Sequence, residues 1–157
     1  MSKIATIRKI ATAVVSAVLL LCAAQPLAAA DFGTADEARA MLQRAIAVLN
    51  ADPAAAIAKF NKGEDGFRDR DLYVFCVNAG DAKTTAHINP SIIGQDVRTF
   101  KDPTGKAFGE EIYSQAQEGK ISEVEYGYPR PGTDKIAPKQ SYFTRAAGQI
   151  CGVGFYK

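Results

Sequence analysis

Apolar and polar positions along the chain change their period once, near residue 70. Before that point, apolar residues recur three and four positions apart, which is the spacing of one face of an α-helix. After it, short apolar or alternating runs are separated by Gly, Pro, Asn and Asp, which predicts strands and turns. The chain therefore divides into a helical N-terminal part and a mainly β C-terminal part.

The helical part predicts two consecutive helices. Thr34 and Glu37 have the spacing of a capping box, and an apolar stripe follows them. Asp52 and Pro53 start the second helix, because Asp is a good N-cap and Pro is tolerated at the first helical position. Gly63 suits the left-handed position that ends a helix.

The C-terminal part predicts five strands. The first run is apolar at nearly every position, as in a central strand covered on both faces, and the third alternates apolar and polar residues. Gly152 and Gly154 in the last strand indicate close approach of a neighbouring side chain or of the helix. The order of elements predicts an α+β domain with a five-stranded antiparallel sheet. The expected strands are 72–77, 83–88, 121–128, 140–145 and 149–156, with a short helix at 108–117.

Residues 1–30 have the pattern of a secretory signal peptide, with basic residues, an apolar run of 15 residues and small residues at its end. We expect cleavage near Ala30 and Asp31, leaving one domain of residues 31–157 in the periplasm or outside the cell. The apolar run is shorter than the roughly 20 residues that span a bilayer. An uncleaved anchor is the alternative. The basic residues are Lys3, Arg8 and Lys9.

The charge of the chain changes when this segment is removed. The whole sequence has 19 Lys and Arg against 17 Asp and Glu, and residues 1–30 carry three basic and no acidic side chains. The remaining chain therefore has a net charge of −1. This gives no electrostatic basis for binding nucleic acid or an anionic membrane surface.

Two cysteines, Cys76 and Cys151, follow the predicted cleavage site. In an exported protein they are read first as a disulfide, because the compartment is oxidising. Two buried free thiols packed as small apolar groups are the alternative.

The chain lacks motifs of catalysis or cofactor binding. It has one histidine, so a His-rich zinc site cannot form, and it has no nucleophile elbow, phosphate loop or dinucleotide fingerprint. We therefore expect no enzyme, no cofactor and no metal.

Polar side chains on or beside half-buried strands are the candidate ligand-binding residues. One lysine with several hydroxyl donors would suit a small carboxylate. A structural role is the alternative for each residue, since a lone histidine is usually structural and a lysine that opens a strand is usually solvated. The candidates are Tyr73, His87, Tyr126, Lys139 and Tyr142.

An ordered set of short motifs across residues 34–157 resembles the single Cache domain of bacterial extracytoplasmic sensors. Each motif alone is weak, and the order makes the set more specific. The matching pieces are DLYVF (71–75), AHINP (86–90), IGQD (93–96), KDPTGK (101–106), EY (125–126), PKQSY (138–142) and GVGFY (152–156).

The resemblance implies a long N-terminal helix packed on a PAS-like five-stranded antiparallel sheet. Numbered along the chain, the five strands would lie side by side in the order 2-1-5-4-3. Cys76 and Cys151 would then be on adjacent strands, which favours the disulfide. The resemblance also implies that the domain binds a small molecule, often a short carboxylic acid. We carry this to His87, Tyr126, Lys139 and Tyr142, with Tyr73 as a weaker addition.

Most Cache domains belong to membrane receptors, whereas this sequence ends at Lys157 directly after the last strand. We therefore expect a standalone binding protein or sensor component with no membrane span after signal cleavage. The alternative is a protein-interaction module with a vestigial pocket, which would act with a membrane receptor or transporter.

Overall fold

Antiparallel strands form a single sheet in the part of the chain that the computed structural model describes, residues 31–157. The strands lie in the order β1-β2-β6-β5-β4, and β3 also pairs with β2. For the five expected strands this is the order that the resemblance implied, so the α+β prediction is confirmed. The predicted signal peptide lies outside the described residues. The strands are β1 (Arg68–Asp69), β2 (Leu72–Asn78), β3 (Thr84–Ala86), β4 (Ser122–Pro129), β5 (Ile136–Ala146) and β6 (Gln149–Tyr156).

Two strands differ in length from the prediction. β3 ends at Ala86 because the next backbone groups bond to side chains: the His87 N–H donates to Asn61 Oδ1 and the Asn89 N–H donates to His87 Nδ1. β5 begins at Ile136 because its pairing with β4 continues to Pro129, inside the region expected to be a loop.

The two N-terminal helices begin and end as the sequence indicated. α1 (Ala35–Ala51) starts with a complete capping box between Thr34 and Glu37, and α2 (Pro53–Lys62) starts where the Asp52 side chain accepts the Ala55 N–H at 3.0 Å. Gly63 ends α2 with a φ of 68°, a left-handed conformation that favours glycine. α3 (Phe108–Gln115) stops two residues before the predicted end. Three short 3₁₀ helices complete the fold: η1 (Glu64–Gly66), η2 (Pro90–Ile92) and η3 (Val97–Thr99). Within residues 31–157, no helix has the length and apolar character that crossing a membrane requires.

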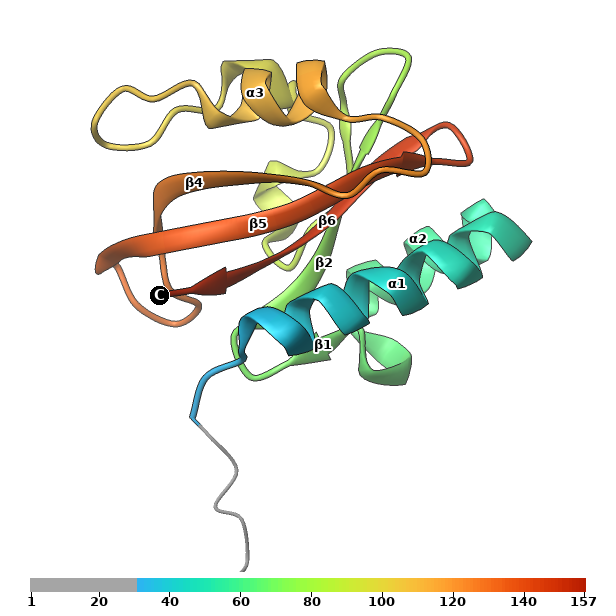
Figure 1. Cartoon of the computed structure of the whole chain (residues 1–157), viewed down its shortest axis with the longest axis horizontal. Coiled ribbons are helices and arrows are strands. Elements are labelled where there is room, and N and C mark those ends of the chain that lie inside the picture. Colours follow the sequence, from blue (N-terminus) through green and yellow to red (C-terminus); the bar gives the residue numbers. More distant parts are fainter. Residues whose placement is uncertain (1–30) are drawn as a thin grey trace, which may run out of the picture.

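The sheet separates two apolar layers (Figure 1). α1 covers one face, and α3 with the segments before it covers the other. Along each strand, alternate residues enter alternate layers. Cys151 and Val153 of β6 face α1, while Phe143 of β5 belongs to the layer beneath α3.

Cys76 and Cys151 form a disulfide, as the oxidising compartment and the implied strand order favoured. The two residues are register partners on β2 and β6, their Cα atoms are 4.1 Å apart, and both are fully buried. The bond joins strands 75 residues apart in sequence, beneath the N-terminal helix. It fixes the alignment of the two strands at the centre of the sheet.

Candidate functional site

A buried lysine lies near the middle of the sheet. Lys139 of β5 is 2% exposed, and its Nζ donates a hydrogen bond to Tyr73 Oη on β2 at 2.9 Å. The long side chain has room because Gly154 lies beneath it: a Cβ on Gly154 would come within 2.3 Å of Lys139 Cε. The glycine pair in β6 therefore marks a close approach, as predicted, and Gly152 makes the same kind of room for Phe75.

Three tyrosine rings surround the Lys139 ammonium group. Nζ lies 4.4 Å from the ring centroid of Tyr73, 4.8 Å from that of Tyr156 and 5.1 Å from that of Tyr128. Within residues 31–157, no carboxylate lies within ion-pair distance of Nζ. Burial lowers the pKa of Lys139 to about 7, and the negative charge of Asp71 only partly opposes this shift. The site thus holds a desolvated amine without a full counter-charge.

A narrow cavity lies next to this lysine, between the sheet and α3. Tyr73 and Tyr128 line it as well as contacting Nζ, and its other walls include Phe108 and His87. Its volume of about 30 Å³ is room for about two water molecules. Thr84 is also a lining residue, and its Oγ1 is buried without a hydrogen-bond partner among residues 31–157. An unsatisfied hydroxyl beside an apolar cavity is available to a ligand.

Two further candidate residues stand in the same walls. The His87 ring packs edge-on against Tyr73, with centroids 5.1 Å apart, and burial together with the charge of Lys139 lowers the pKa of His87 to about 4. Because its Nδ1 accepts the Asn89 N–H, the neutral ring carries its proton on Nε2. Tyr126 stacks on Phe108 with centroids 4.0 Å apart. Its hydroxyl shares a hydrogen bond of 2.9 Å with Ser141 Oγ, and burial raises its pKa.

A wider hollow of about 390 Å³ lies on the outer side of this wall. Tyr73, His87 and Tyr128 line both the hollow and the narrow cavity. The other residues around the hollow include Arg68 and Arg130. The aromatic wall therefore stands between the buried cavity and a space with room for a small molecule.

Comparison with known proteins agrees with this arrangement. The sequence profile of the family described as Single Cache domain 2 matches residues 35–156. The chain belongs to this Cache family. Cache domains are extracytoplasmic, ligand-binding sensor domains.

Relatives of this Cache domain are chemotaxis receptors. The methyl-accepting chemotaxis protein McpP of Pseudomonas putida is 30% identical over 90 residues, which cover 56% of this chain and 16% of the receptor. A methyl-accepting chemotaxis protein from Vibrio parahaemolyticus has the same fold, with a TM-score of 0.63 and 20% identity over 77% of this chain and 86% of that one. A Cache chemosensory domain described for its recognition of carboxylic acids has a TM-score of 0.59 and 27% identity, over 77% of this chain and 91% of that one.

Within this Cache domain, four of the five candidate residues lie together and the fifth does not. Tyr73, His87, Tyr126 and Lys139 share the α3 side of the sheet. Tyr142 lies in the layer beneath α1, where Arg39 stacks over its ring at 4.3 Å. Positions three apart on a strand point to opposite faces, so the spacing from Lys139 to Tyr142 separates them.

The sequence reasoning also missed residues of the site. Tyr128 follows Tyr126 by two positions on an alternating strand, and this spacing alone places the two side chains on one face. Tyr156 is the register partner of Lys139 across the strand pair, which only the strand alignment reveals. Thr84 gave no signal, because a threonine on a strand is ordinary.

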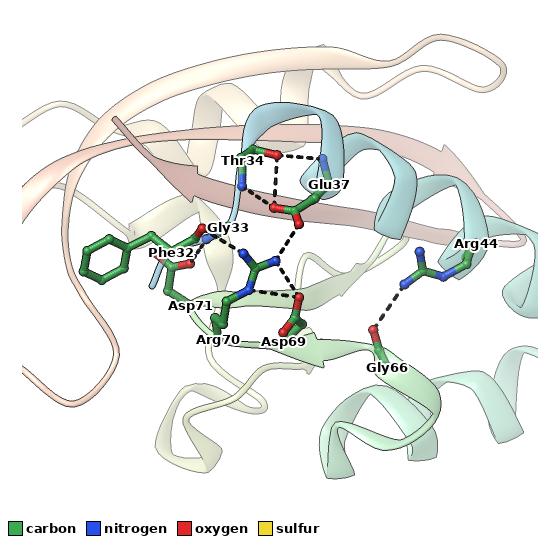
Figure 2. Close-up of polar contacts among 9 residues, drawn as sticks. All are labelled: Phe32, Gly33, Thr34, Glu37, Arg44, Gly66, Asp69, Arg70 and Asp71. Carbon is green, nitrogen blue, oxygen red and sulfur yellow. Dashed lines mark hydrogen bonds and ion pairs between the residues drawn. The ribbon is translucent and has the colours of Figure 1, made fainter. Parts of the chain in front are cut away.

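A second polar cluster lies around Phe32, Gly33 and Asp71, where the chain enters the domain (Figure 2). The buried carboxylate of Asp71 accepts the Gly33 N–H at 2.7 Å and pairs with Arg130 Nη1 at 3.1 Å. The Arg130 guanidinium lies over the rings of Phe32 and Tyr156, at 4.1 and 4.6 Å. Arg130 therefore connects Phe32 of the N-terminal segment to Tyr156, one of the tyrosines around Lys139.

Arg70 holds the other side of this N-terminal cluster. Its guanidinium donates to the Phe32 carbonyl at 2.9 Å and to carboxylates of Glu37 and Asp69, each at 2.7 Å (Figure 2). The hydrogen bonds to Asp69 and Glu37 raise the pKa of Arg70, and the bond from Arg70 is the main cause that lowers the pKa of Glu37 to about 2. This cluster consists of mutually satisfied charges.

Proposed function

We propose that this Cache domain binds a short-chain carboxylate whose carboxyl group pairs with Lys139. The observation that carries the proposal is the buried Lys139 amine, which has a phenol as its hydrogen-bond partner and no carboxylate within ion-pair distance among residues 31–157. An uncompensated buried cation destabilises the fold. A ligand carboxylate would supply the missing charge through charge-assisted hydrogen bonds.

The surrounding side chains suit the rest of such a ligand. The hydroxyl of Tyr73 and the Nε2–H of neutral His87 would donate to carboxylate oxygens, and the unsatisfied Thr84 hydroxyl would gain a partner. The aromatic walls would cover a short apolar tail. Because the cavity has a volume of only about 30 Å³, binding requires the ring of Tyr73 or Tyr128 to move.

The relatives support a sensory role. A Cache domain with 27% identity is described for carboxylic acid recognition, and the receptor McpP is a chemotaxis protein of which this chain spans 16%. We infer that residues 31–157 act in the periplasm or outside the cell as a binding or sensor component. A membrane receptor would be the partner that receives the signal.

A thermal-shift screen of the purified protein tests the proposal. Short carboxylates, amino acids, amines and purines are added, and a carboxylate at 100 times its Kd should stabilise the native state by about 2.7 kcal/mol, a shift of several degrees. Lys139→Met should abolish this shift. The control is Lys101→Met, which changes an exposed lysine and should leave the shift intact. A screen without any carboxylate shift would overturn the proposal and favour the alternative of an interaction module with a vestigial pocket.

A further inference from the structure

We propose that the hollow outside the aromatic wall is an outer subsite of the same pocket, in which Arg68 binds a second anionic group of the ligand. The preferred ligands are then short dicarboxylates rather than monocarboxylates. This inference rests on the proposed function, because one carboxylate of the ligand is assigned to Lys139.

Most of the ligand would lie in the hollow, because the hollow is much larger than the inner cavity. The inner cavity measures about 30 Å³ and the hollow about 390 Å³. Tyr73, His87 and Tyr128 form the wall between them, and two of these rings touch Lys139 Nζ. A shift of either tyrosine would join the two spaces and expose the lysine to a ligand that already occupies the hollow.

Arg68 is placed to meet the outer end of such a ligand. It is the register partner of Tyr73 on the neighbouring strand, and antiparallel partners project to the same face of a sheet. Its aliphatic chain packs on Gly63, where an added Cβ would lie 2.8 Å from Arg68 Cβ. Among residues 31–157, no hydrogen bond or ion pair engages its guanidinium, and a guanidinium binds a carboxylate through two parallel hydrogen bonds.

Among the charged residues around the hollow, Arg68 is the one suited to bind the second anionic group. Arg130 also lines the hollow, but its guanidinium is paired with Asp71 and lies over the rings of Phe32 and Tyr156. Asp134 is an exposed carboxylate that also lines the hollow, and its negative charge would oppose an anionic ligand. In the described part of the chain, Lys139 and Arg68 are thus two basic groups without an ion-pair partner, on opposite sides of one aromatic wall, which complements a ligand with two negative charges.

Isothermal titration of the purified protein with succinate and with acetate tests the inference. Succinate should bind at least tenfold more tightly than acetate. Arg68→Gln should remove this advantage while it leaves the acetate affinity unchanged, and Asp134→Asn should strengthen succinate binding. Arg39→Gln is the matched control, because Arg39 lies on the α1 side of the sheet and should affect neither ligand.

Each other outcome separates the two proposals. Equal affinities for succinate and acetate in the unchanged protein, or equal losses for both ligands in Arg68→Gln, would overturn the outer subsite and leave the Lys139 proposal standing. Absence of binding by both acids, or binding of both that Lys139→Met does not weaken, would overturn the proposed function and the outer subsite together. Melting temperatures of all variants establish that they are folded.

Discussion

Two cations, Arg70 and Lys139, lie near the start of β2, and their surroundings differ. Arg70 donates to a carbonyl and to two carboxylates, so its charge is matched within the fold. Lys139 is more deeply buried, yet within residues 31–157 its partners are the Tyr73 hydroxyl and three aromatic faces, with no carboxylate in ion-pair distance. A cation that holds a fold together comes with its counter-charges, whereas one that awaits a ligand lacks them. The comparison therefore distinguishes a structural cluster from the proposed binding site.

Removing the disulfide tests whether the stability of the fold and the carboxylate affinity of the Lys139 site depend on the same bond. Replacing Cys76 and Cys151 by serine should lower the free energy of unfolding by about 4 kcal/mol, because the bond closes a loop of about 75 residues. Chemical denaturation with and without reductant measures this loss. Carboxylate affinity of the folded variant should change little, since Lys139 and Tyr73 lie on the other side of the sheet. A large loss of affinity would show that the site depends on this bond.

Replacing each cation should have opposite effects on stability. Lys139→Met should raise the free energy of unfolding at pH 7, by on the order of 3 kcal/mol, because it removes a desolvated amine whose pKa lies near 7. Arg70→Met should lower the melting temperature, since it leaves Glu37 and Asp69 without their partner. Thermal unfolding of both variants measures the pair. The same direction of change in both would break the comparison.

Asp71 connects the two regions, because it pairs with Arg130 and its charge acts on Lys139. Asp71→Asn should cost about 2 kcal/mol of stability, since a buried carboxylate bonded to Arg130 and to the Gly33 N–H is neutralised. It should also lower the pKa of Lys139 further, which NMR titration of the Lys139 amine measures. An unchanged pKa would mean that the clusters are electrically independent.

Replacing Thr84 should have the smallest effect on stability. Thr84→Val removes a buried hydroxyl that has no hydrogen-bond partner in the described part of the chain, so the unliganded protein should become more stable by up to about 1 kcal/mol. If the hydroxyl serves the ligand, carboxylate affinity should fall several-fold in the same variant. A loss of stability without loss of affinity would mean that the hydroxyl is satisfied in solution and has no part in binding.

Most of the fold could be predicted from the sequence because its signals are local. The capping box at Thr34, the Asp52–Pro53 junction and the alternation in β4 each depend on neighbouring residues only. β3 ended early because Asn61, which is distant in sequence, accepts the His87 N–H. Contacts of this kind are invisible in a single strand pattern.

The candidate site was predicted only in part, because it too depends on contacts between residues that are distant in sequence. Lys139 could be named from its motif, but its burial depends on Gly154 across the strand pair, and so does the position of Tyr156. Tyr142 was grouped with Lys139 from proximity in sequence, although strand alternation separates them. Pairing between distant strands thus decided which residues meet.

Proton uptake on ligand binding tests the central claim most directly. In the free protein the pKa of Lys139 is about 7, so at pH 8 the amine is mostly neutral, and an anion bound beside it favours the ammonium form. Calorimetric titration with a carboxylate, in two buffers of different ionisation enthalpy at pH 8, should therefore report net proton uptake on binding. Affinity should be level below pH 7 and fall as the pH rises above it. A binding enthalpy that is equal in both buffers, with an affinity that does not change between pH 6 and pH 9, would contradict the account.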